Sequence, residues 1–277
     1  MGIESNRKKD EEKGSTSTSS LVLFPKLKYL DLRFMEEWEE WDGMGESGVS
    51  ESVLIMPCLQ VLTIQQCPKL KSLPNFLEKT LLEKLTVDCR ISNWMTLACH
   101  LPRLKWLRCD NRNSGEHFPT LGKLLFLESL MICDAESVKK VGFEFLGIEE
   151  ESNNNNKKKI DEEKGSTSSS LSSLVLFPNL KSLSFWRLKE WEEWDGIRGT
   201  MREEEAQDSG VTITIMPCLQ DLSINDCPKL KSLLDFLPTT PLKTLRIQRS
   251  LILSECCKAE IGDQWPKISH IPNVEID

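Results

Sequence analysis

Histidine and cysteine are the residue types in this 277-residue chain that most readily hold metal ions or act as nucleophiles. The three histidines, His100, His117 and His270, lie in no H-E-x-x-H or similar spacing, and the ten cysteines form no C-x-x-C pair. The sequence also lacks G-x-x-x-x-G-K-[ST] and G-x-G-x-x-G, the glycine-rich patterns that bind phosphates. We therefore expect a protein without catalytic activity, metal site or cofactor.

Composition and charge narrow the classes of partner. The net charge of −8 argues against nucleic-acid binding, which needs a basic surface to neutralise phosphates. No apolar stretch approaches the roughly 20 residues that cross a bilayer, so we expect no membrane partner. The opening segment MGIESNRKKDEEKG lacks the apolar core of a secretory signal. We therefore expect a cytoplasmic protein with reduced cysteines.

One pattern, L-x-x-L-x-L with other apolar residues allowed at its last position, recurs along the chain. Nine copies, of which the last is the weakest, begin at Leu27, Leu59, Leu82, Leu104, Leu127, Leu180, Leu219, Leu242 and Ile271. Successive copies between Leu59 and Leu127 lie 22 or 23 residues apart, within the range of leucine-rich repeats.

The last two apolar positions of each copy are two residues apart, so on a strand they point to the same side. One short strand cannot bury its apolar face, and neighbouring strands must stack into a sheet. The sequence therefore predicts an α/β-type repeat solenoid. In this leucine-rich-repeat horseshoe, a parallel β-sheet lines the concave face, and the convex side is irregular or made of short helices.

Polar segments interrupt the repeats and divide the chain. Residues 1–20 are of low complexity and predicted to be disordered, and residues 21–277 form the solenoid. Within the solenoid we expect a disordered insertion at 147–173 and acidic loops at 36–51 and 190–208.

A block of roughly 150 residues is duplicated. EWEEWDG at 37–43 returns at 190–196, and MPCLQ together with CPKLKSL at 56–73 returns at 216–233. We interpret the chain as the C-terminal piece of a longer array that lacks an N-terminal cap. Cys67 and Cys227 occupy the position after each strand where a small side chain turns the backbone, which indicates packing and not redox or metal chemistry.

The two acidic loops carry −13 together, so the rest of the chain carries +5. They are either solvated loops or an electrostatic contact with another domain or partner. Each contains two tryptophans three residues apart, a spacing that fits one side of a helical turn. Trp38, Trp41, Trp191 and Trp194 either cover the repeat core or serve as interface anchors.

The outward-pointing residues of the strands are the candidate protein-binding site. They would form the concave surface, the extended face that solenoids offer to partners. Trp106, Arg108, Trp186 and Arg246 are of the types that dominate interface energetics. The full candidate set is Tyr29, Asp31, Arg33, Lys84, Asp88, Trp106, Arg108, Asp110, Trp186, Asp221, Asn225, Arg246 and Gln248.

The wording of the repeats is more specific than a general leucine-rich pattern. FPKLKYLDL, EEWEEWDG, MPCLQVLTIQQCPKLKSLP and the closing DQWPKISHIPNVEID resemble the C-terminal repeats of plant intracellular disease-resistance proteins of the coiled-coil nucleotide-binding leucine-rich-repeat class. The resemblance implies recognition of a pathogen effector, directly or through a guarded host protein. It also implies autoinhibition of a nucleotide-binding switch domain, in cis or in trans. The coiled coil and switch module are missing from this sequence, so we expect no nucleotide binding.

Two other functions remain open. Leucine-rich repeats also serve as substrate adaptors of ubiquitin ligases, although no helical adaptor-binding segment precedes Leu21. Alternatively, the chain is a truncated receptor remnant or a decoy.

Overall fold

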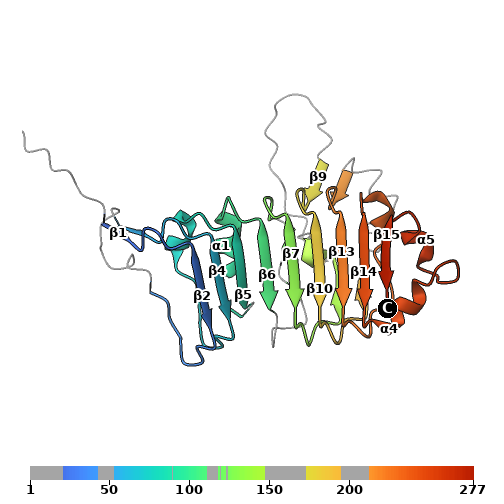
Figure 1. The fold of residues 1–277 in the computed structure, drawn as a ribbon, viewed down its shortest axis with the longest axis horizontal. Helices are drawn as coiled ribbons and strands as arrows, with labels where there is room; N and C mark the ends of the chain where they lie inside the picture. The colour runs from blue at the N-terminus through green and yellow to red at the C-terminus, as the bar shows by residue number, and fades with distance from the viewer. Residues whose placement is uncertain are drawn as a thin grey trace, which may run out of the picture.

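The fold is a stack of parallel strands, seen in a computed structural model that describes residues 21–42, 53–88, 90–110, 118, 120–122, 124–146, 173–194 and 212–277 (Figure 1). The segment 1–20, most of the 147–173 insertion, and residues 43–51 and 195–208 of the acidic loops lie outside the described residues. Their predicted disorder stays a prediction.

All nine copies of the repeat pattern form a strand, and the nine strands make one parallel sheet. From the N-terminal edge they are β2 (Tyr29–Arg33), β4 (Val61–Gln65), β5 (Lys84–Asp88), β6 (Trp106–Asp110), β7 (Ser129–Cys133), β10 (Ser182–Trp186), β13 (Asp221–Asn225), β14 (Thr244–Gln248) and β15 (Asn273–Ile276). The 53-residue gap between Leu127 and Leu180 does not interrupt the sheet, because β7 pairs directly with β10.

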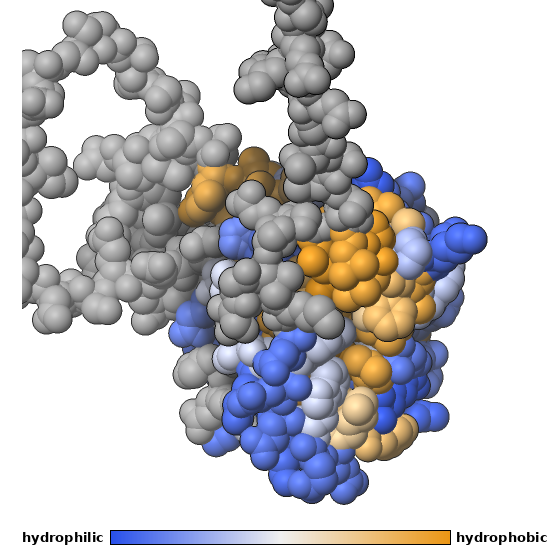
Figure 2. Space-filling model, turned by 90° about the vertical axis from the view of Figure 1, so that its left-hand side faces the viewer, coloured by the Kyte–Doolittle hydropathy of each residue, from blue (hydrophilic) through white to orange (hydrophobic). Residues whose placement is uncertain are grey.

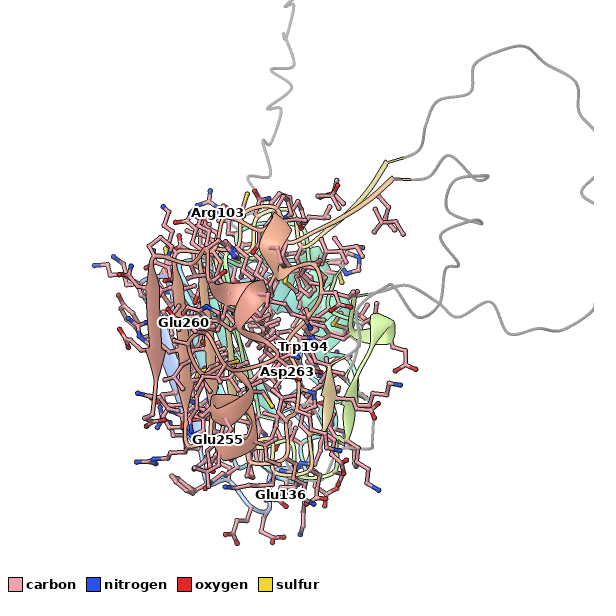
Figure 3. All side chains as sticks on the ribbon, turned by 90° about the vertical axis from the view of Figure 1, so that its right-hand side faces the viewer. Arg103, Glu136, Trp194, Glu255, Glu260 and Asp263 are labelled. Atoms are coloured by element: carbon pink, nitrogen blue, oxygen red, sulfur yellow. The ribbon has the colours of Figure 1, made fainter. Side chains whose placement is uncertain are left out.

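The convex side carries short helices, as the fold prediction requires. They are η1 (Asn75–Lys79), α1 (Trp94–His100), α2 (Phe143–Leu146), η3 (Leu237–Thr239), α4 (Leu251–Cys256) and α5 (Trp265–Ile268). Viewed from the C-terminal end, the strands overlie one another in a single layer, and Trp194 lies on the side away from that layer (Figure 3). The horseshoe-type α/β repeat fold is thus confirmed. Within the described part of the chain, no helix has the length and apolar character needed to cross a bilayer.

Three small parallel sheets add a second layer that the repeat pattern did not predict. They join β1 (Leu21–Leu23) to β3 (Val53–Ile55), β9 (Ser173–Leu176) to β12 (Thr212–Ile215), and β8 (Lys140–Val141) to β11 (Glu193–Trp194). Because β9 begins at Ser173, the predicted insertion ends one residue earlier than expected.

The core is the continuous stack of inward-pointing side chains. In β4, Leu62 and Ile64 are fully buried while Val61, Thr63 and Gln65 between them are half-buried, and this alternation recurs in most strands. Each buried leucine or isoleucine contributes about 1.5–3 kcal/mol. Stability therefore accumulates repeat by repeat.

Each strand ends in a sharp turn at one residue in the left-handed region. In Phe34, Asp134, Arg187 and Asp226, φ lies between 57° and 59°, and the backbone N–H of each donates to the carbonyl of the last residue of the next strand. This hydrogen bond turns the chain out of the sheet without leaving a buried backbone donor unpaired.

The acidic tryptophan segments cover the core on extended backbone, not on the helical turn that their spacing suggested. Trp191 is fully buried and Trp194, in β11, is 5% exposed, with ring centroids 5.2 Å apart. Trp38 and Trp41 repeat this arrangement half-buried, with centroids 5.3 Å apart. In the described residues, the tryptophans therefore act as core cover.

Acidic side chains of these segments pair with lysines of the next repeat. Lys229 lies 2.6 Å from Glu190, and Lys231 lies 2.8 Å from Glu192. In the first block, Lys69 lies 2.5 Å from Glu37. Such exposed pairs contribute only about 0–1 kcal/mol each, so they align repeats more than they stabilise them. They also occupy, within the chain, carboxylates that were candidates for an external partner.

Candidate functional site

The outward residues of the sheet lie in three rows that cross the strands. The parallel pairing aligns equivalent positions of neighbouring strands, so a residue of one repeat lies beside its counterpart in the next. Adjacent strands are about 4.8 Å apart, which places counterparts within side-chain reach. All thirteen candidate residues belong to these rows.

Exposure separates the candidates into groups. Tyr29 is 67% exposed and Trp186 is 42% exposed. Others that are exposed are Asp31, Arg33, Lys84, Asp221, Arg246 and Gln248. Those that are half-buried are Trp106, Arg108, Asp110 and Asn225.

Asp88 corrects the expectation of an open binding residue. It occupies an outward position of β5, but it is only 4% exposed. Arg90, in the turn after the strand, folds back over the carboxylate, and its Nε donates to Asp88 at 2.9 Å. The hydrogen bond to Asp88 raises the pKa of the Arg90 guanidinium, so the pair stays charged at neutral pH. The strand register placed Asp88 in the right row, but it could not show that the next turn covers it.

Three neighbouring carboxylates at the carboxyl ends of β5, β6 and β7 are each held by an arginine. Besides the Asp88–Arg90 pair, the Nε of Arg108 donates to Asp110 at 2.9 Å. Asp134 follows β7 and is 7% exposed, and it accepts a 2.8 Å hydrogen bond from Arg187.

Pairing matters because a buried carboxylate without a partner is destabilising. Each guanidinium retains further N–H groups for a partner, since arginine has five donors.

Hydrogen bonds also tie the carboxylates to strands that are not adjacent. The side chain of Gln65 in β4 donates to Asp110 in β6 at 2.7 Å and so passes across β5. On the other side, the amide of Asn225 donates to Gln248 at 2.9 Å. These contacts fix side-chain positions before any partner binds, which lowers the entropy cost of association.

Trp186 stands at the centre of this region. Its register partners are Cys133 in β7 and Asn225 in β13, and the next residue is Arg187. We name Arg90, Arg108, Trp186 and Arg187 the arginine–tryptophan band. Arg90, Arg187 and Asp134 were missing from the sequence prediction because they follow strands and do not lie within them. The signal that could have revealed them is a charged residue one or two positions beyond each repeat pattern.

Buried cysteines lie beside this surface but are poorly suited to act as nucleophiles. Burial raises the pKa of Cys133 to about 12, and it raises the pKa of Cys227 and Cys257 to about 12 as well. The Sγ of Cys67 lies 3.5 Å from the carbonyl oxygen of Gln65 and is buried, as expected for a packing residue. Among the residues that the structure describes, no three His, Cys, Asp or Glu side chains converge as metal ligands would.

We expect alkylation of the native protein at pH 8 to separate the cysteines. The thiolate is the reactive species, so Cys133, Cys227 and Cys257 should remain unlabelled by iodoacetamide. Cys99, which is exposed on α1, should be labelled first. Peptide mass spectrometry after timed quenching measures this order, and labelling in guanidinium chloride gives the reference in which burial is removed. Rapid native labelling of Cys133 would contradict the burial described for the band.

Comparison with known proteins places the repeats in a family. No protein-family model matches the chain. The probable disease resistance proteins RF45 and RDL5 of Arabidopsis thaliana are each 31% identical to it over 256 residues. That alignment covers 91% of this chain but 18% of each relative. The probable disease resistance RPP8-like protein 2 of the same plant is 30% identical over 208 residues, 70% of this chain and 18% of the relative.

The chain thus spans less than a fifth of the length of the curated relatives that it matches. The similarity extends over nearly all of its own length, including both duplicated blocks. It confirms the resemblance that the repeat motifs indicated. As a segment of leucine-rich repeats, the chain belongs to the family of plant disease resistance proteins.

Proposed function

We propose that this chain is a recognition module of plant defence that binds another protein through the concave sheet and acts in the cytoplasm by binding rather than catalysis. The disease-resistance role of its relatives supports the biological setting. The arginine–tryptophan band supports the location of the binding surface.

One observation carries the proposal: Trp186 is 42% exposed in the middle of a rigid sheet. A large aromatic ring exposed to water is costly unless a partner covers it, and Trp and Arg are the residue types most enriched at interface hot spots. The flanking pair of Arg187 and Asp134 is already hydrogen-bonded. The surface is therefore prearranged to bind with little loss of side-chain freedom.

The partner that we propose is a pathogen protein or the host protein that such a pathogen protein modifies. A second proposed partner is a nucleotide-binding switch domain, held inactive by the repeats until the first partner binds. The length of the relatives, more than five times that of this chain, leaves room for such a domain in them. Both partners would be proteins, in keeping with the mixed-charge surface of paired Arg and Asp.

Photo-crosslinking tests the location of the site. Benzoylphenylalanine at Ser184, beside Trp186 on the concave face, is compared with the same group at His100 on convex helix α1. In infected plant tissue, a discrete crosslinked protein from position 184 and none from position 100 would support the proposal. Peptides of that protein identify it as pathogen or host. Crosslinks of equal yield from both positions would contradict a concave site.

Three substitutions are expected to weaken binding of the crosslinked protein at least tenfold. Trp186→Ala, Trp106→Ala and Arg108→Ala each remove an outward side chain of hot-spot type, which commonly costs 2 kcal/mol or more. All three residues are partly solvent-exposed, so the fold should be retained. Titration calorimetry measures the dissociation constants, with His100→Ala as the control on the opposite side. Unchanged affinity in all three variants would remove the band from the site.

A further inference from the structure

The N-terminal end of the solenoid exposes apolar side chains that elsewhere in the molecule are buried. Phe24 is 61% exposed and Phe34 is 68% exposed, and Leu21 beside them in β1 is 55% exposed. In the nine-stranded sheet, β2 is an edge strand that pairs only with β4. Figure 2, which views this end, shows apolar surface gathered on it. We call the surface formed by β1, β2 and the residues from Phe24 to Met35 the N-terminal apolar end.

The duplication provides an internal reference for this surface. LVLFPKLKYLDLRF at 21–34 corresponds to LVLFPNLKSLSFWR at 174–187, so equivalent residues differ by 153 in number. Phe177 is fully buried, whereas its counterpart Phe24 is 61% exposed. Leu188 is fully buried, whereas its counterpart Met35 is 39% exposed. Nearly the same sequence in the same local fold is therefore covered once and uncovered once.

The repeat at 121–146 is what covers the second copy. Its strand β7 pairs with β10 through all five residues. Phe145 in α2 lies with its ring centroid 5.4 Å from that of Phe177 and 6.3 Å from that of Phe185. The carbonyl of Gly122 accepts the backbone N–H of Phe177 at 3.3 Å.

This covering repeat has chemistry that can be specified. Gly122 lies so close to the turn after α2 that a Cβ there would be 1.7 Å from the carbonyl oxygen of Leu146. The repeat also provides Leu130 and Ile132, both fully buried, as the apolar pair that faces the core from β7. A repeat that covers this type of face thus combines a glycine, an L-x-x-L-x-L strand and an aromatic ring on a short helix.

We propose that the N-terminal apolar end is a docking surface for a further leucine-rich repeat of the type found at 121–146. Its strand pairs in parallel with β2 and places its apolar pair beside Leu30 and Leu32. Its aromatic ring packs on Phe24, and its glycine carbonyl accepts the backbone N–H of Phe24. This inference rests on packing alone and is independent of what the concave face binds.

Residues 1–20 do not have the composition of this occupant. Met1 and Ile3 are their only large apolar residues, and they contain no aromatic residue. They could therefore supply neither the paired apolar positions nor the ring that the second copy receives from Phe145.

The test adds the proposed occupant to the full repeat region. A second copy of residues 101–173 replaces residues 1–20, so that it joins Leu21 as residue 173 joins Leu174. The readout is hydrogen exchange of the β2 amides, with the amides of β10 in the same molecule as the covered reference. We expect exchange in β2 to slow at least tenfold and to approach that of β10. Unchanged exchange in β2 would overturn the proposal.

A matched control keeps the length but removes the packing. In the added copy alone, the residues equivalent to Leu130 and Phe145 are changed to aspartate, and β2 should then exchange as in the original chain. Slow exchange in this control as well would overturn the proposal, since tethering and not docking would explain it.

Two measurements on the original chain test other occupants. A dimer in sedimentation velocity that is abolished by Leu32→Asp would show that a second copy covers the surface. Faster exchange of β2 after deletion of residues 1–20 would show that this segment covers it. Either result would overturn the proposal, whereas a monomer with unchanged exchange supports it.

Discussion

Trp191→Ala is expected to lower the free energy of unfolding by about 3–5 kcal/mol, the usual loss for a large aromatic residue removed from a core. Trp191 is fully buried. Its ring centroid lies 4.7 Å from that of Phe185 and 5.2 Å from that of Trp194, so alanine would leave a cavity between rings from three segments. Guanidinium denaturation followed by circular dichroism measures the loss.

The duplicated block offers a matched control for this substitution. Trp38 stands in the same sequence and its indole N–H donates to the Glu40 carbonyl at 2.8 Å, as that of Trp191 donates to Glu193 at 2.8 Å. Trp38 is half-buried at the open end of the stack. Trp38→Ala should therefore cost less, about 1–2 kcal/mol. Equal losses at the two positions would show that burial by the preceding repeat does not set the stability of this motif.

Leu62→Asp is expected to cost about 4–5 kcal/mol, because it places a carboxylate without a partner in the core. Leu62 is fully buried in β4, between Leu30 of β2 and Leu85 of β5. The loss should appear first as rapid proteolysis and hydrogen exchange in the repeats on either side of β4. Limited proteolysis with mass spectrometry locates that region.

Thr63→Asp supplies the same charge one residue further along the same strand. Thr63 points outward and is half-buried, so the change should cost less than about 1 kcal/mol. The difference between the two variants measures the side to which each residue points. Similar stability of both variants would mean that the strand register is wrong.

The strands and their register could be predicted because the repeat pattern states the same physical requirement nine times. Two apolar residues at a spacing of two must share a face, and the 22- or 23-residue period makes them stack. The small sheets were not predictable in this way. The LVL segments of β1 and β9 have no 22-residue partner, and each pairs with a strand that follows a segment of varied length.

The candidate surface was predictable as rows but not as contacts. Outward positions follow from the period of two, so Trp186 and Arg108 were found. The cover on Asp88 depends on where the turn after β5 directs Arg90, and sequence spacing does not encode that direction. The tryptophan pairs were placed on a helical turn by spacing alone, whereas strand pairing between β8 and β11 keeps the backbone extended at Trp194.

The direct pairing of β7 with β10 has a consequence for how such a protein can diversify. The two strands meet in the same register as strands whose repeats are 22 residues apart, although 53 residues separate the equivalent leucines. Loop length adds only slowly to the entropy cost of closure, by about 0.6 kcal/mol for each doubling. Insertions and deletions between these strands are therefore nearly neutral for folding. Natural selection can rewrite the rim of the solenoid at this junction while the concave sheet retains its geometry.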